Sequence, residues 1–265
     1  MESFTELSSL ATKVATAAGE LILKRRIAGV SVAASKSSLE DVVTPTDREA
    51  EALIRSMLSD ARPEDGFLGE ESGKQSGTSG LTWVVDPIDG TVNFLYGIAH
   101  FAVSIAVVEG EPEPSTWRAL AGAVYNPSVD ELFSAVSGEG SLLNGKQIRV
   151  SEPSEFGLSL IATGFSYRSK IRVEQVELLA QIVPKVRDIR RMGSAALDLC
   201  SVASGRLNGY FERELKPWDH AAGALIAREA GATVSGIANF APDERMLIAS
   251  APSIHDQLRT LILGN

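Results

Sequence analysis

Two aspartates follow a short apolar stretch within residues 83–91 (WVVDPIDGT). Asp86 directly follows a valine-rich stretch typical of a buried strand, and Asp89 follows three residues later. We expect the strand to stop at Asp86, because Pro87 favours a turn. Gly90 and the residue after it would place backbone amides behind the two carboxylates. Carboxylate oxygens suit hard divalent cations and amides suit phosphate, so the run predicts a metal site beside a phosphate.

Acidic residues recur at two further places. Glu70 and Glu71 stand before a loop rich in serine and glycine, and Asp219 stands where a helix is expected to begin. Alone, the glutamates would be ordinary solvated residues and Asp219 would be a helix N-cap. Together with the aspartates of residues 83–91, they form the oxygen-rich ligand set that Mg²⁺ prefers.

No set of histidines and cysteines in the sequence competes with these carboxylates for a metal such as zinc. His100, His220 and His255 are scattered along the chain, and Cys200 is the only cysteine. A single cysteine cannot form a disulfide within the chain, which is typical of proteins from a reducing compartment. The apolar neighbours of Cys200 indicate a buried core thiol.

A rival mechanism within phosphate chemistry forms a covalent aspartyl-phosphate. Asp86 and the sequence that begins at Asp89 (DGT) resemble the D-x-D-G-T start of haloacid-dehalogenase-type phosphatases. Here the two acids are three residues apart rather than two, and they lie deep in the chain rather than near its N-terminus. We therefore favour attack by a metal-activated water.

The composition is that of an ordinary globular protein, with 44% hydrophobic and 22% charged residues in a length of 265. The formal net charge of −9 argues against a nucleic-acid-binding face, which needs a basic stripe. The tight basic cluster Lys24-Arg25-Arg26 is expected at the exposed last turn of a first helix. No apolar run reaches the roughly 18 residues of a membrane span, and the N-terminus lacks the basic region of a signal peptide. We expect a cytoplasmic protein with neither membrane nor nucleic acid as a partner.

Two helices are expected ahead of the first long strand. Apolar residues recur at helical spacing over residues 7–22, and this helix should end near Gly29. In the second helix, Thr46 is the expected N-cap and Glu49 its capping-box partner. Asp47 then lies in the first helical turn.

The remaining pattern divides the chain into two halves. After a polar, flexible loop at residues 72–80, the first half continues as an antiparallel meander, with strands at 101–108, 120–126 and 132–137. The second half alternates strands at 158–163, 188–190, 209–211, 233–235 and 246–249 with helices at 174–185, 194–204, 219–230 and 254–263. We expect residues 1–145 to form an α+β half with most of the metal ligands. Residues 146–265 would form an α/β half with Asp219 and the residues on the substrate side, in one compact unit with the site at the junction.

Four short motifs occur in order along the chain: DVVTPTD at residues 41–47, GEES at 69–72, WVVDPIDGT at 83–91 and PWDHAAG at 217–223. On these motifs the chain resembles the Mg²⁺-dependent, lithium-sensitive phosphatases of the inositol monophosphatase family over nearly its whole length. Within that family it is most similar to bacterial inositol-1-monophosphatases. The resemblance implies a layered α/β/α/β/α sandwich, like that of inositol monophosphatase and fructose-1,6-bisphosphatase, and a homodimer.

The resemblance also implies a set of metal ligands. Glu70, Asp86 and the backbone carbonyl of Ile88 would hold one Mg²⁺. Asp86, Asp89 and Asp219 would hold a second. A third, weaker ion would rest on Glu70 and on water, and Mn²⁺ could substitute for Mg²⁺. These ions would neutralise the phosphoryl oxygens and activate a water for in-line attack, with no covalent intermediate.

By the same resemblance, Thr91, hydrogen-bonded to Asp47, would orient or deprotonate that water, with Glu70 as a further catalytic group. The implied substrate-binding residues are Gly90 and Thr91, whose amides would grip the phosphate, Gly193, Ser194, Ala195 and Glu212, which would contact the ring, and Asp89 and Asp219. Lys36 matches a family lysine near a mobile metal-binding loop.

The substrate is less well defined than the reaction. The resemblance favours a small phosphorylated polyol, foremost myo-inositol 1-phosphate. Histidinol phosphate, fructose 1,6-bisphosphate and 3′-phosphoadenosine 5′-phosphate are alternatives, because Arg213 and Lys216 could reach a second anionic group. We favour the interpretation that both are plain surface charges. A non-enzymatic alternative is a regulatory partner of the transcription machinery.

Overall fold

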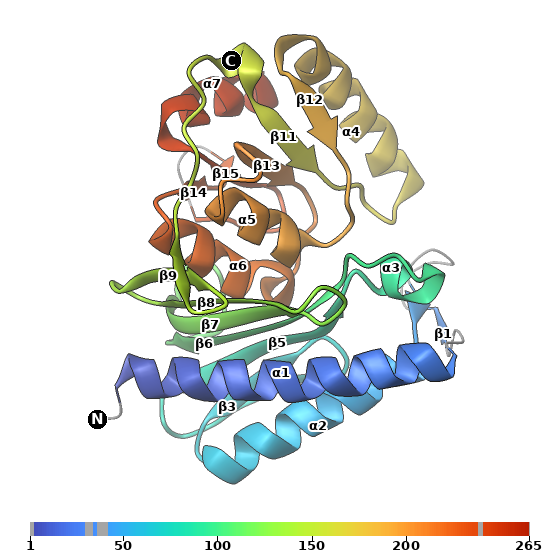
Figure 1. The fold of residues 1–265 in the computed structure, drawn as a ribbon, viewed down its shortest axis with the longest axis vertical. Coiled ribbons are helices and arrows are strands. Elements are labelled where there is room, and N and C mark those ends of the chain that lie inside the picture. Colours follow the sequence, from blue (N-terminus) through green and yellow to red (C-terminus); the bar gives the residue numbers. More distant parts are fainter. Residues whose placement is uncertain (1–2, 30–33, 36–41, 238–240, 265) are drawn as a thin grey trace.

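The computed structural model describes residues 3–29, 34–35, 42–237 and 241–264. Lys36 and the first aspartate of the DVVTPTD motif, Asp41, lie outside the described residues. Helices and sheets alternate in layers, as Figure 1 shows, with α1 and α2 at the bottom and α4 and α7 at the top. The α/β/α/β/α sandwich expected from the resemblance is confirmed.

Two helices cover the outer face of the first sheet, α1 (Phe4–Ala28) and α2 (Pro45–Ala61). The first ends at Gly29 (φ 105°), as its periodicity predicts. The N-cap predicted for the second is wrong. It is Thr44, whose Oγ accepts from the N–H of Thr46 at 3.2 Å, and Asp47 completes the capping box. Proline suits the first position of a helix because its missing N–H is not needed there, and so Pro45 moves the start upstream.

The first sheet has eight strands in the order β10-β9-β8-β7-β6-β5-β3-β4. They are β3 (Gly66–Gly69), β4 (Gly73–Gln75), β5 (Leu81–Asp89), β6 (Ala102–Glu109), β7 (Arg118–Asn126), β8 (Glu131–Val136), β9 (Gly140–Leu143) and β10 (Lys146–Ile148). The pairs are antiparallel except β3 with β5, so the predicted meander is confirmed. A separate pair joins β1 (Ala34–Ser35) to β2 (Val42–Val43).

Three boundaries in this half differ from the prediction. Residues 72–80 are not all loop, because β4 pairs with β3 there. The strand expected to stop at Asp86 continues to Asp89. The change of rhythm near residue 145 falls inside the β9–β10 hairpin, where Asn144 (φ 48°) and Gly145 (φ 75°) form the turn. Such a two-residue turn favours strand pairing on both sides, so the first sheet runs on to residue 148.

The second sheet has five strands in the order β12-β11-β13-β15-β14. They are β11 (Leu160–Thr163), β12 (Asp188–Arg190), β13 (Gly209–Glu212), β14 (Thr233–Ser235) and β15 (Leu247–Ser250). The helices of this half are α4 (Ser169–Ile182), α5 (Ala195–Ala203), α6 (Pro217–Glu229) and α7 (Pro252–Leu263), and the short α3 (Thr91–Tyr96) follows β5. In the described part of the chain, 3₁₀ turns lie at Phe156–Leu158 and Val183–Lys185.

Alternation along the strands distributes side chains among three apolar cores. In β5, Trp83 and Val85 pack in the core under α1 and α2, whereas Val84 packs in the core between the two sheets. In β13, Tyr210 faces the core between the sheets and Phe211 faces the outer core with α7. Because successive side chains of a strand point to opposite faces, both sheets are covered on both sides.

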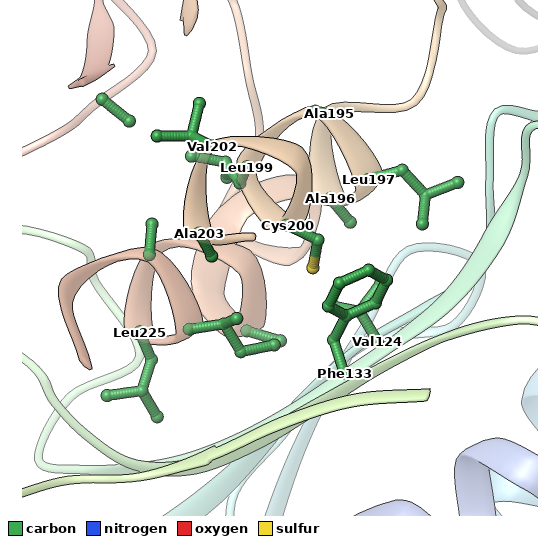
Figure 2. Close-up of a cluster of buried hydrophobic side chains, with 14 of the residues drawn as sticks. Val124, Phe133, Ala195, Ala196, Leu197, Leu199, Cys200, Val202, Ala203 and Leu225 are labelled. Carbon is green, nitrogen blue, oxygen red and sulfur yellow. The ribbon is translucent and has the colours of Figure 1, made fainter. Parts of the chain in front are cut away.

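The predicted core thiol is confirmed. Cys200 is fully buried on α5, and burial raises the pKa of its thiol well above the usual range. Figure 2 shows its sulfur directed toward Phe133 and Val124 of the first sheet. The helix pair α5 and α6 therefore joins the two sheets through a common core. In the part of the chain that the structure describes, no helix is long and apolar enough to cross a membrane.

Candidate active site

A cleft of about 500 Å³ opens where the first sheet meets α5 and α6. Its lining brings together residues that the sequence analysis drew from both halves: Glu70, Asp86, Ile88, Asp89, Gly90, Thr91, Gly193, Ala195, Glu212 and Asp219. Ser194 and Asp47 lie behind this lining and contact it through Asp89 and Thr91. Every predicted metal-ligating, catalytic and substrate-binding residue that the structure describes therefore lies in or directly behind one cleft.

A β-bulge in β5 turns both aspartates toward the cleft. Asp86 pairs with Ser104 and Asp89 with Ala102, so three steps along β5 match two steps along β6. In a regular strand, residues three apart point to opposite faces. The extra residue restores a common face, as bulges beside active sites often do. The spacing of the two acids thus depends on this irregularity.

The carboxylate of Asp89 also anchors the second half of the chain. Its Oδ2 accepts hydrogen bonds from Ser194 Oγ at 2.6 Å and from the N–H of Ala196 at 2.7 Å. Burial raises the pKa of Asp89 to about 6, while the hydrogen bond from Ser194 and the amides of Ala196 and Ala195 act to lower it. The start of α5 favours a negative charge here, because the helix dipole is positive at its N-terminus.

Glu70 is positioned by the parallel pair β3 and β5. These strands end at the same edge, and the N–H of Glu70 donates to the carbonyl of Val85 at 3.2 Å. The turn beyond it is held by Glu51 of α2, a buried residue that sequence reasoning missed. The carboxylate of Glu51 accepts from the N–H groups of Glu71 and Ser72, each at 2.8 Å. The signal available in the sequence was the position of Glu51 four residues after Asp47, because residues four apart on a helix lie on the same face.

Thr91 and Asp47 are in contact. Thr91 Oγ1 lies 3.2 Å from Asp47 Oδ1 and 3.0 Å from the carbonyl oxygen of Ile88, so its one hydroxyl proton can go to either. Asp47 is fully buried, and its Oδ2 accepts from the N–H of Thr44 at 2.8 Å. The first turn of α2 therefore holds a carboxylate directly behind the hydroxyl that lines the cleft.

Asp219 is not the N-cap of α6. Pro217 takes the first helical position, and Asp219 lies two residues further on, where its Oδ2 accepts from the N–H of Lys216 at 2.6 Å. The preference of proline for the first position again moves the helix start upstream. The other carboxylate oxygen is not used by this bond, so Asp219 can serve both the helix and the cleft.

The acids of the cleft destabilise one another when ionised. Burial is the largest cause that raises the pKa of Asp86, followed by the charges of Glu70, Asp89 and Asp219. The pKa of Asp219 is also raised well above the usual range, by burial and then by Glu70 and Asp89. A cation among these groups would offset both effects.

The donor set fits Mg²⁺ chemically, because it consists of carboxylate and carbonyl oxygens. Among the described residues, no three His, Cys, Asp or Glu side chains are close enough together to hold a metal ion as they stand. The described lining of the cleft contains no histidine, cysteine or methionine, the usual nitrogen and sulfur ligands of transition metals.

Glycines let the two halves approach closely at the cleft. Gly90 has φ 91°, and a Cβ there would lie 3.0 Å from the carbonyl oxygen of His100 and 3.1 Å from that of Gly193. Asn93, another residue that sequence reasoning missed, fixes this contact. Its Nδ2 donates to the carbonyls of His100 and Met192, each at 2.7 Å. One amide of α3 thereby holds the segment that leads into α5.

The far side of the cleft carries Glu212. Burial raises the pKa of this carboxyl to about 7, although it accepts a hydrogen bond from Tyr210 Oη at 2.6 Å. Gly164 lies against it so closely that a Cβ would overlap the carboxylate. Arg213 and Lys216 both line the cleft rather than only the outer surface, and each is paired, with Glu174 at 3.3 Å and Glu244 at 2.9 Å.

The chain is similar to proteins of one family throughout its length. The profile of the inositol monophosphatase family matches residues 4–263. A Mycobacterium tuberculosis protein named inositol-1-monophosphatase SuhB is 42% identical over 276 residues, which cover 95% of this chain and 91% of the relative. An Escherichia coli protein named Nus factor SuhB is 41% identical over 230 residues, 86% of this chain and 84% of the relative. The crystal structure of extragenic suppressor protein SuhB from Bartonella henselae superposes with a TM-score of 0.89 at 37% identity, over 97% of this chain and 98% of that one.

Proposed function

This chain belongs to the inositol monophosphatase family, a family of phosphatases, and we infer its function from that membership. We propose Mg²⁺-dependent hydrolysis of a small phosphate monoester, with myo-inositol 1-phosphate as the substrate. The observation that carries the proposal is the bulge that turns Asp86 and Asp89 to one cleft, beside Glu70 and Asp219. Such an oxygen-rich group next to a buried hydroxyl–carboxylate pair suits phosphoryl transfer to water.

Five residues would hold the metal ions in this proposal. Glu70, Asp86 and the carbonyl of Ile88 would hold one Mg²⁺. Asp86, Asp89 and Asp219 would hold a second. Glu70 would also hold a third, weaker ion. Mn²⁺ could take the same oxygen ligands. When bound, such ions lower the pKa of a coordinated water and neutralise phosphoryl oxygens.

The remaining residues bind substrate and handle the proton. Thr91 Oγ1 would accept a hydrogen bond from the attacking water while donating its own proton to Asp47, which the 3.2 Å contact supports. The amides of Gly90 and Thr91 would bind the phosphate. Glu212 would accept a hydrogen bond from a substrate hydroxyl. Ser194 would act through Asp89, which it contacts at 2.6 Å, rather than on the substrate alone.

The charges at the rim favour a neutral polyol over a bisphosphate or a nucleotide with a second phosphate. Arg213 and Lys216 could have met a second anion, but Glu174 and Glu244 already neutralise them. Histidinol phosphate has no second phosphate, so it stays the nearest alternative substrate. The name of the relative from Mycobacterium tuberculosis supports inositol 1-phosphate.

Phosphate release from a panel of substrates tests this proposal. The purified protein is assayed with Mg²⁺ and, in parallel, Mn²⁺ on inositol 1-phosphate, histidinol phosphate, fructose 1,6-bisphosphate and 3′-phosphoadenosine 5′-phosphate. We expect inositol 1-phosphate to give the highest kcat/KM. Asp86→Asn should abolish both activity and Mg²⁺ binding, whereas Asp188→Asn, at an exposed surface pair with Arg190, should change neither. If no ester is hydrolysed with either metal, the proposal fails.

One observation favours a second role, because the relative from Escherichia coli is named a Nus factor. A regulatory partner of the transcription machinery would act through its surface and not through turnover. An Asp89→Asn variant separates the two roles: a regulatory phenotype would persist when turnover is lost. The homodimer and the cytoplasmic location stay predictions.

A further inference from the structure

Glu214 adopts a backbone conformation that side chains other than glycine rarely take. Its φ is 69°, in the left-handed region, which is unfavourable for a residue with a Cβ. The conformation is held by its N–H, which donates to the carbonyl of Glu244 at 2.6 Å. Its side chain lines the cleft, two residues beyond Glu212. The strained backbone therefore places a carboxylate at the cleft rim.

The carboxylate of Glu214 joins two loops across that rim. It accepts a hydrogen bond from Ser166 Oγ, and it pairs with the guanidinium of Arg168, whose Nε lies 3.2 Å from Oε2. Ser166 and Arg168 follow β11, and Glu214 follows β13. These strands are parallel neighbours, so their C-terminal ends meet at one edge of the second sheet. Gln175 of α4 steadies the first loop by accepting from the N–H of Ser166 at 2.9 Å.

Arg168 is one of the cations that a second anion on a substrate would meet in this cleft, which is also lined by Arg191, Arg213 and Lys216. Its side chain is 69% exposed, it lines the cleft, and Glu214 neutralises it. Without the carboxylate of Glu214, Arg168 would present a guanidinium fork, which suits phosphate and carboxylate groups. With Glu214 in place, an incoming anion meets a neutral ion pair.

We propose that Glu214 is a specificity-determining residue that selects phosphate esters of neutral polyols against substrates carrying a second anionic group. It acts by holding Arg168 in an ion pair, so that the guanidinium is neutralised at the rim. The inference rests on the proposed phosphatase function and adds the residue that sets the substrate class.

The test compares kcat/KM for fructose 1,6-bisphosphate with that for inositol 1-phosphate, both with Mg²⁺. Glu214→Gln removes the charge and keeps the size of the side chain. Glu214→Gly removes the charge and suits the left-handed backbone, so it guards against loss of folding in the first variant. Glu111→Gln is the matched control, because it removes a carboxylate from an exposed ion pair with Lys74. Arg168→Gln combined with Glu214→Gln removes both partners.

We expect the ratio of the bisphosphate to the monophosphate to rise about fivefold in both Glu214 variants, which is the scale of an exposed charge pair. The ratio should be unchanged in Glu111→Gln, and the gain should vanish in the double variant. An unchanged ratio in both Glu214 variants overturns the inference, as does a gain that survives removal of Arg168. Either result leaves the proposed function standing when wild type hydrolyses inositol 1-phosphate. Failure of wild type on both substrates overturns that function, and the inference with it.

Discussion

Asp89→Asn should make the metal-free protein more stable, although it removes a proposed metal ligand. Asp89 is only 9% exposed, and burial raises the pKa of its carboxyl from 3.8 to about 6. Folding therefore disfavours the ionised form, and the free energy of unfolding falls as the pH rises from 3.8 through 6. Asparagine carries no charge over this pH range, so the free energy of unfolding of the Asp89→Asn variant does not show this decline.

The size of the effect follows from the pKa and from the hydrogen bonds. A rise from 3.8 to about 6 corresponds to about 3 kcal/mol at pH 7.5 and to about half of that at pH 5. Both hydrogen bonds to the carboxylate end on Oδ2, from Ser194 and Ala196, so the amide oxygen of asparagine can accept both. A neutral acceptor weakens them by about 1 kcal/mol in all. We expect a net gain of about 2 kcal/mol at pH 7.5, and of less than about 1 kcal/mol at pH 5.

Urea unfolding in EDTA at the two pH values measures this gain. Asp188→Asn is the control, because the exposed Asp188 has its pKa lowered by Arg190 and its replacement should not stabilise the protein. In excess Mg²⁺ the order should reverse, since an ion at 100 times its Kd adds about 2.7 kcal/mol to wild type alone. A variant less stable than wild type in EDTA at pH 7.5 would refute the reasoning. So would an advantage equally large at pH 5.

Three further predictions follow from single contacts. Thr91→Ala should lower kcat about 100-fold while calorimetry finds Mg²⁺ affinity nearly unchanged, because the hydroxyl is proposed to act on water; lost metal binding would contradict that role. In Glu51→Gln, the side chain cannot accept hydrogen bonds from both amides of the turn after Glu70. The Mg²⁺ affinity should therefore fall about tenfold or more, while the circular dichroism spectrum is unchanged. Retained Mg²⁺ affinity would show that Glu51 does not position Glu70. Burial lowers the pKa of His255, so the free energy of unfolding should decline as the pH falls below 6.5. His255→Gln should reduce that decline. An equal decline in wild type and variant would show that His255 does not cause it.

Apolar periodicity predicted most of the elements because burial alone decides them. The strands of the meander and the helices around Cys200 follow from side chains that pack on one face or on both. Cys200 itself was predicted as core from its apolar neighbours, and it lies between the sheets. In such segments the local pattern and the tertiary contacts favour the same structure, so the sequence is sufficient.

Helix starts were harder to predict, because several residues near each start can cap. Thr44 and Thr46 are both good caps, and the choice depends on Pro45 between them. At α6, Pro217 likewise takes the first position and leaves Asp219 inside the helix. At the N-termini of α2 and α6, the position of proline therefore predicts the first helical residue better than the presence of a side chain that could cap the helix.

The positioning residues of the site could not be predicted, because their partners are far away in sequence. Asn93 donates to the carbonyl of Met192 99 residues away, and Glu214 meets Arg168 46 residues away. No local periodicity records such a pairing. The proposed metal ligands were predicted from motifs, whereas the groups that hold them in place could be found only from the fold.

The sequence of residues 83–91 contains the features that allow the β-bulge in β5. Asp86 and Asp89 can share a face only if the strand carries one residue more than its neighbour, and the residues between them make this possible. Pro87 has no N–H to leave unsatisfied in the ladder, and the N–H of Ile88 donates at 3.0 Å to Oδ1 of Asp86. The bulge thus leaves no backbone donor unpaired between the two acids. The run D-P-I-D is therefore a strand that continues through the site, and a β-bulge, in place of the turn predicted at Pro87, directs both carboxylates into the cleft.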